Sequence, residues 1–152
     1  MNRYSALALA LALAIPPALA QEREWSLDSS EDEAFMIFGV PESDDVGISF
    51  WCSLRSGEVR IFVPEASEKL GANKIVNFDV FVGNQSFSIS GNTLPNEEAG
   101  TMSIEGIVPV AHPLFAALKS AGHFSVKVES DAQSFPLAGA DIDTLLNACG
   151  KS

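Results

Sequence analysis

The chain has 152 residues, of which 47% are hydrophobic and 19% charged, and its formal net charge at pH 7 is −11. This length and apolar content predict one globular domain and exclude an intrinsically disordered chain. The acidic balance argues against nucleic acid and anionic membrane surfaces as partners, because both require a basic footprint.

The N-terminal segment has the layout of a secretory signal peptide. Arg3 precedes an apolar run over residues 6–15, a double proline ends the run, and Ala18-Leu19-Ala20 provides small residues for cleavage. A membrane helix needs about 20 apolar residues, so this run is too short to be one, and we expect no membrane span later in the chain. We therefore expect residues 1–20 to be removed and residues 21–152 to form a single β-rich domain in the periplasm or outside the cell.

Alternating apolar residues predict that strands dominate the chain between residues 24 and 129. The runs are short and are separated by clusters of Gly, Pro, Asn and Asp. The runs are Trp25–Ser29, Ala34–Val40, Val46–Ser53, Glu58–Val63, Lys74–Val82, Gln85–Gly91, Thr101–Val110 and Phe124–Glu129. About eight short strands with short links indicate a mainly β fold, an antiparallel sandwich or a partly closed barrel.

The side-chain alternation within these runs predicts which residues face the core. In the run over 46–53, Cys52 falls on the core face and Trp51 on the opposite face. The run over 74–82 is apolar on both faces, which is typical of a central strand buried on both sides. Gly83-Asn84 predicts a tight hairpin after that run, and Arg55-Ser56-Gly57 predicts a hairpin between the third and fourth runs.

Two helices are predicted in the C-terminal part of the chain. Pro113 suits a first helical turn and Gly122 can end the helix, so a short helix lies between them. A second helix is expected over residues 140–148, followed by Gly150 as its terminator. Its apolar stripe consists of Ile142, Leu145, Leu146 and Cys149.

The two cysteines predict one disulfide. Cys52 lies on the core face of a strand and Cys149 on the apolar face of the last helix, in a chain that carries an export signal. A bond between them would pin the C-terminal helix onto the sheet. The alternatives are a redox pair, which lacks the close Cys-x-x-Cys spacing, and two buried free thiols.

The sequence contains no recognised catalytic signature. His112 and His123 are the only imidazoles, and a turn or capping role before Pro113 accounts for His112. The acidic stretches 31–33 and 44–45 lack the spaced ligands of a calcium loop and are typical of solvated turns. We therefore expect no enzymatic activity, no cofactor and no metal site. An enzyme would require one of the imidazoles to meet a carboxylate in a cleft.

A candidate partner surface is formed by Trp51, Arg55 and Arg60. Trp51 lies on the face opposite Cys52, and the two arginines bracket the adjoining hairpin, so an aromatic ring and two guanidinium groups can meet on one surface. The alternative is that the C-terminal helix or another strand covers Trp51 and that the arginines pair with carboxylates.

The C-terminal third resembles known small exported proteins. The residues that carry the resemblance are Pro113-Leu114-Phe115-Ala116-Ala117-Leu118-Lys119-Ser120-Ala121-Gly122, a strand, and Phe135-Pro136-Leu137-Ala138-Gly139-Ala140 before a Leu-rich helix. This tail is similar to that of periplasmic proteobacterial proteins of the invasion-associated locus B type and of type VI secretion accessory proteins. The resemblance implies a β-rich accessory protein without known enzymatic chemistry.

These observations predict a non-enzymatic exported protein that binds another protein and supports an envelope or secretion assembly. The alternative is an acidic inhibitor of a basic exported enzyme such as a lysozyme, because strong negative charge steers association with a cationic partner.

Overall fold

The structure is a computed structural model that describes residues 22–151, so the predicted signal peptide lies outside the described residues. Within this range the chain is mainly β, with nine strands and two short helices. The strands are β1 (Glu24–Ser29), β2 (Glu33–Gly39), β3 (Val46–Ser53), β4 (Glu58–Ser67), β5 (Ile75–Val82), β6 (Gln85–Asn96), β7 (Thr101–Pro109), β8 (His123–Val128) and β9 (Asp131–Pro136); the helices are α1 (Pro113–Lys119) and α2 (Ile142–Cys149).

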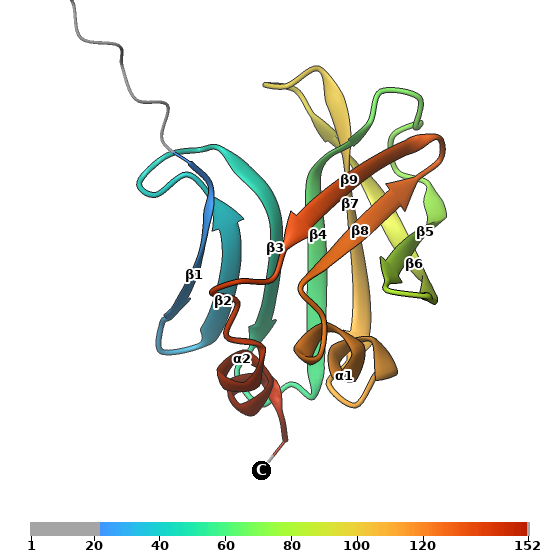
Figure 1. The fold of residues 1–152 in the computed structure, drawn as a ribbon. Helices are drawn as coiled ribbons and strands as arrows, with labels where there is room; N and C mark the ends of the chain where they lie inside the picture. The colour runs from blue at the N-terminus through green and yellow to red at the C-terminus, as the bar shows by residue number, and fades with distance from the viewer. Residues whose placement is uncertain (1–21, 152) are drawn as a thin grey trace, which may run out of the picture.

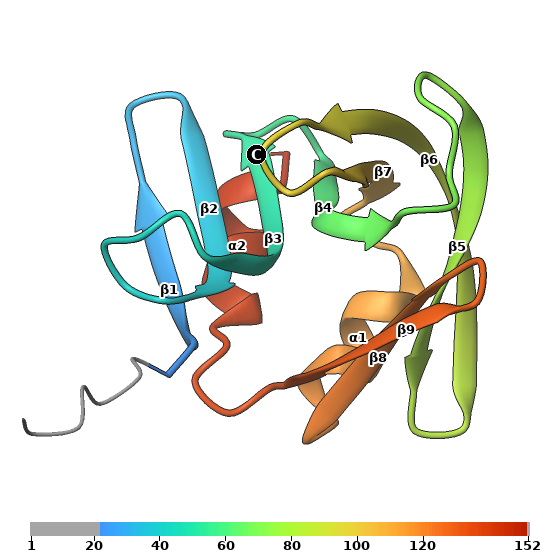
Figure 2. The same ribbon diagram turned by 90° about the horizontal axis from the view of Figure 1, so that it is seen from above.

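The strands form one antiparallel sheet in the order β1-β2-β3-β4-β7-β6-β5-β8-β9. Figures 1 and 2 show that this sheet curls into a half-barrel, with β1 and β9 as its two edge strands. Of the two predicted architectures, the structure therefore has the partly closed barrel. The predicted hairpins are confirmed, since β3 pairs with β4 and β5 pairs with β6 across Gly83-Asn84.

The ninth strand was not among the eight predicted runs. β9 pairs with β8 from Val128↔Asp131 to His123↔Pro136. It escapes the hydrophobic pattern because Phe135 is its only buried residue and most of its other side chains are polar. Antiparallel pairing to β8, rather than burial of its own side chains, holds it in the sheet.

The prediction that the fifth run is buried on both faces is wrong. β5 does lie inside the sheet, between β6 and β8. However, its outward side chains face solvent, with Ile75 76% and Phe81 38% exposed. The alternation of apolar residues identifies the two faces of a strand, but it does not say whether a second layer covers each face.

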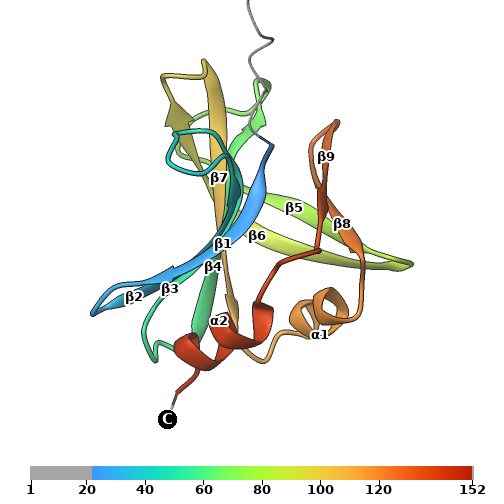
Figure 3. The ribbon, with the colours of Figure 1, turned by 60° about the vertical axis from the view of Figure 1, so that its left-hand side comes forward.

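The core fills the concave face of the sheet. Figures 1 and 3 show α1 and α2 at the same end of the half-barrel, where α2 contacts β2, β3 and β4, and α1 contacts β5. Three members of the predicted stripe of α2 are buried, namely Ile142, Leu145 and Cys149, while Leu146 is half-buried. Among residues 22–151, no helix has the length and apolar character needed to span a bilayer.

The predicted disulfide is confirmed. Cys52 of β3 is bonded to Cys149 of α2, and the two Cα atoms lie 5.7 Å apart. Two main-chain hydrogen bonds support the same junction, because the N–H groups of Arg55 and Gly57 donate to the carbonyls of Ala148 and Cys149 at 3.0 and 2.8 Å. The C-terminal helix is therefore fixed to the β3–β4 turn.

Trp25 joins the two edges of the half-barrel. Its indole Nε1 donates to the carbonyl of Pro136 in β9 at 2.6 Å. Its ring lies 5.2 Å from Phe38, 6.1 Å from Phe50 and 6.5 Å from Phe124, measured between centroids. Because Phe124 belongs to β8, the indole packs across the gap between the edges; we call this contact the aromatic seam.

Replacing both Cys52 and Cys149 with alanine should lower the free energy of unfolding by about 2–5 kcal/mol. The bond spans 97 positions, and closing so long a loop restricts the unfolded chain. Urea denaturation followed by circular dichroism measures the effect. Reductant should destabilise the wild-type chain and leave the double variant unchanged; equal stability of oxidised and reduced wild type would contradict the prediction.

The variant Trp25→Phe should lose about 1 kcal/mol of unfolding free energy, because it keeps an aromatic ring but removes the hydrogen bond to Pro136. Trp25→Ala should lose several times more, since it also removes the packing in the aromatic seam. Phe81→Leu, at an exposed aromatic position on the outer face of β5, is the control and should change stability by less than about 0.5 kcal/mol. Equal stability of Trp25→Phe and Phe81→Leu in urea denaturation would rule out a stabilising aromatic seam.

Candidate functional site

Four side chains from four neighbouring strands meet on the outer face of the sheet, the face turned away from the core. They are Phe35 of β2, Trp51 of β3, Arg60 of β4 and Glu105 of β7, and we call them the outer-face cluster. Strand register brings them together, because Phe35 lies opposite Trp51 and Trp51 lies opposite Arg60. Glu105 lies opposite Phe62, one diagonal step from Arg60.

The members of the cluster hold one another in place. The guanidinium carbon of Arg60 lies 4.9 Å from the centre of the Trp51 ring, and Arg60 Nη1 pairs with Glu105 Oε1 at 2.9 Å. Trp51 Nε1 donates to Glu105 Oε2 at 3.3 Å, and Phe35 stacks beside Trp51 with ring centroids 6.3 Å apart. Exposed ion pairs and cation–π contacts each contribute about 1 kcal/mol or less to stability. The cluster therefore orients its side chains more than it stabilises the fold.

The structure brings together two of the three residues of the predicted partner surface and places the third elsewhere. Trp51 and Arg60 are in contact, but Arg55 is not part of the cluster. Arg55 lies in the β3–β4 turn, where its N–H donates to Ala148 of α2, and its side chain lines a different hollow beside Lys151. The hydrogen bonds between this turn and the C-terminal helix place Arg55 beside the helix and not on the outer face.

The alternative interpretation, in which the helix covers Trp51 and the arginines pair with carboxylates, is wrong for Trp51 and right for Arg60. Trp51 is not covered by the C-terminal helix, because α2 is bonded to the opposite face of β3 through Cys52, and Trp51 stays half-exposed. Arg60 does pair with a carboxylate, that of Glu105, yet its side chain remains 40% exposed. Both groups are thus held in place and still accessible.

A hollow of about 580 Å³ lies next to the outer-face cluster, and we call it the groove. Ile37, Ser49 and Phe62 in its wall are each two residues along the strand from a member of the cluster, so the two features are continuous. The complete lining is Ile37, Asp44, Val46, Ser49, Phe62, Pro64, Pro95, Asn96, Glu97 and Ser103. The groove is not among the features predicted from the sequence, although β2 carries apolar residues on both faces, which is a signal for it.

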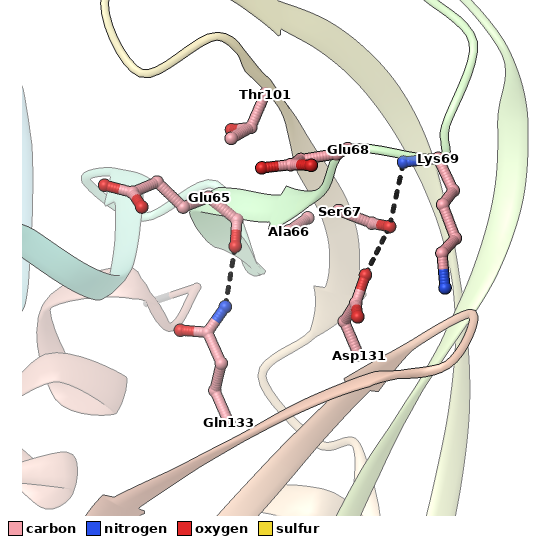
Figure 4. Close-up of a pocket in the computed structure, with 8 residues that line it drawn as sticks. All are labelled: Glu65, Ala66, Ser67, Glu68, Lys69, Thr101, Asp131 and Gln133. Atoms are coloured by element: carbon pink, nitrogen blue, oxygen red, sulfur yellow. Dashed lines mark hydrogen bonds between the residues drawn. The ribbon is translucent and has the colours of Figure 1, made fainter.

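A second hollow, of about 410 Å³, lies between the end of β4 and the β8–β9 hairpin (Figure 4). Gln133 Nε2 donates to the carbonyl of Glu65 at 2.6 Å, and Ser67 Oγ donates to Asp131 Oδ2 at 2.6 Å. The main-chain N–H of Lys69 donates to Ser67 Oγ at 3.2 Å. The first two bonds fasten β9 to β4 and the third orients Ser67, and we call the three together the polar seam.

The chemistry available in the polar seam is limited. Ser67 and Asp131 form a hydroxyl–carboxylate pair without an imidazole among the lining residues. A serine nucleophile is usually activated by an adjacent imidazole base, so this pair lacks the usual means of nucleophile activation. The buried hydroxyl of Thr101 has no hydrogen-bond partner among the described residues. The seam is best explained as a structural contact.

Neither histidine lines the groove or the polar seam. His112 is the N-cap of α1, and its Nδ1 accepts a hydrogen bond from the N–H of Leu114 at 3.2 Å, as the capping interpretation expects. The His112 ring also packs edge-on against Phe87, with centroids 5.9 Å apart. His123 is exposed at the start of β8. Within residues 22–151, no group of three or more His, Cys, Asp or Glu side chains is placed to hold a metal ion.

The variant Ser67→Ala should lower the free energy of unfolding by about 1–2 kcal/mol, because it leaves Asp131 and the N–H of Lys69 without their shared partner. Ser67 is 5% exposed, so water replaces this partner poorly. The matched control is Ser90→Ala at an exposed position of β6, where urea denaturation should show almost no change. Equal effects of the two substitutions would show that the polar seam does not hold β9 in place.

Comparisons with known proteins do not assign a function to these features. The similarity of residues 113–122 and 135–140 to the invasion-associated locus B type stays a prediction, because no comparison tests it. No family model, curated protein or solved structure matched the chain.

Proposed function

We propose that the chain is a non-enzymatic exported binding protein that contacts a protein partner through the outer-face cluster. The observation that supports this most directly is the half-exposed ring of Trp51 with the Arg60 guanidinium stacked on it. Tryptophan and arginine are the residues most enriched at the energetic centres of protein interfaces. Here they lie on inner strands of the sheet, so little conformational entropy is lost when a partner binds.

The surroundings of the cluster also suit a protein interface. Ile107 lies opposite Arg60 in β7 and is 45% exposed, and Phe62 and Ile37 add further apolar area. The outward residues of β6, next to this area, are mostly polar, namely Ser86, Ser88, Ser90 and Asn92, and Leu94 is the one apolar exception at 43% exposure. An apolar centre bordered by polar residues is the usual anatomy of a protein interface.

Two roles fit such a binding protein. The first is accessory support of an envelope or secretion assembly, which the export signal and the C-terminal resemblance favour. The second is inhibition of a basic exported enzyme such as a lysozyme, which the net charge of −11 favours, because opposite charge accelerates association. The first role predicts partners in the envelope, and the second predicts loss of a partner's catalytic activity.

The experiment that tests the proposal is affinity capture from a periplasmic extract, with the oxidised chain and two single variants as baits. Trp51→Ala and Arg60→Ala should each reduce retention of the partner at least tenfold, because each removes about 1.4 kcal/mol or more of binding energy. The matched control is Phe81→Ala, which truncates an exposed aromatic residue of β5 on the same outer face of the sheet and should leave retention of the partner unchanged.

The two roles are separated by assaying what is captured. Inhibition of a cationic lysozyme at low ionic strength, relieved by salt, would identify the inhibitor role. Retention of envelope components without such inhibition would identify the accessory role. Equal retention by the wild type and both cluster variants would refute the proposed surface, and catalytic turnover that a His112 or His123 substitution abolishes would refute the non-enzymatic assignment.

A further inference from the structure

The floor of the groove is apolar and is built from the sheet itself. Phe62 and Pro64 come from β4, Ile37 comes from β2, and Pro95 comes from the end of β6. Ser103 is buried beneath them at 4% exposure, and its hydroxyl donates to the carbonyl of Pro64 at 2.7 Å. The groove lies where the β3–β4 pairing ends at Ser49↔Phe62 and the β4–β7 pairing is interrupted between Val63 and Ser67, so it is an open hollow in the outer surface of the sheet.

The rim of the groove is acidic. Asp44 comes from the loop after β2 and Glu97 from the turn after β6, and both side chains are exposed. Figure 1 shows both segments at the end of the sheet opposite the helices. The ion pairs among the described residues involve Asp45, Glu105 and Asp143, so the carboxylates of Asp44 and Glu97 have no basic partner there.

The arginines near the groove do not offset this charge. Arg60 is paired with Glu105 and Arg23 with Asp45, so neither pair contributes net charge to the surface. An occupant of the groove therefore meets an apolar floor between two uncompensated carboxylates. Water solvates these exposed carboxylates in the free chain, and an occupant that displaces this water replaces the lost hydration best with positive charge.

Four classes of occupant are disfavoured by this arrangement. A second copy of the chain carries the same net charge of −11 and would place like charges around the interface. Nucleic acids and anionic lipid surfaces are repelled by the rim for the same reason. A neutral aliphatic molecule would fill the floor but make no use of the two carboxylates.

Resting on the proposed function, we infer that the groove binds an exposed loop of a basic protein. One aliphatic side chain of the loop enters the groove and contacts Ile37 and Phe62. Flanking lysine or arginine side chains pair with Asp44 and Glu97. The adjacent outer-face cluster supplies the second half of the same interface. The partner therefore contacts both the groove and the outer-face cluster.

The test uses three synthetic cyclic peptides of equal length and the ¹⁵N-labelled oxidised chain. The first peptide presents Lys-Leu-Arg, the second replaces its leucine with serine, and the third presents Glu-Leu-Glu. The first should shift the amide resonances of Ile37, Ser49 and Ser103, and its affinity should fall when salt is raised from about 20 to about 200 mM. The other two should bind at least tenfold more weakly.

Charge-reversal variants show whether the acidic rim is responsible for binding of the Lys-Leu-Arg peptide. Asp44→Lys with Glu97→Lys should weaken binding of the Lys-Leu-Arg peptide at least tenfold. The matched control is Glu31→Lys with Glu129→Lys, which changes the net charge equally at exposed turn positions outside the groove and should weaken binding less than threefold. All four substitutions are at exposed sites, and circular dichroism verifies the fold of each variant.

Several results would overturn the inference: resonance shifts elsewhere on the chain, equal binding of the Glu-Leu-Glu peptide, or equal weakening by both charge-reversal variants. Affinity capture distinguishes this failure from failure of the proposed function. If retention of the natural partner depends on Trp51 but not on Asp44 and Glu97, the groove inference fails and the outer-face cluster stands. If retention depends on none of these residues, both fail.

Discussion

A half-barrel must seal its concave face without the strand pairing that closes a complete barrel. In this chain the sealing is divided among three contacts that differ in chemistry. The disulfide from Cys52 draws α2 against one end, the indole of Trp25 joins the two edge strands, and Ser67 fastens β9 to β4. The hydrophobic core depends on all three contacts, because each one keeps water away from a different side of the packed core.

The same constraint leaves the outer face of the sheet free. Both helices are used to cover the concave side, so residues 22–151 supply no second layer for the convex side (Figure 3). Apolar residues there, such as Phe35, Trp51 and Ile107, contribute little to the core. Such residues, held together on rigid strands beside a groove with an acidic rim, suit the recognition of another molecule that we propose.

The sequence predicts those features that follow from local pattern. Alternation placed Cys52 and Trp51 on opposite faces of one strand, and turn chemistry located the two hairpins correctly. It could not place Arg55, because the direction of that turn is set by hydrogen bonds to a helix about ninety residues away in the chain. Likewise, the groove is assembled from β2, β3, β4, β6 and β7 and their loops, and no single segment carries a pattern for it.

The position of the disulfide has a consequence for biogenesis. Cys149 follows all nine described strands, so the bond cannot form until every strand has been synthesised and, if the chain is exported as proposed, translocated. With two cysteines in the sequence, oxidation within one chain has a single outcome. The chain therefore needs an oxidant but no disulfide isomerase, and, if it is exported as proposed, its covalent closure marks that translocation has gone past the last strand.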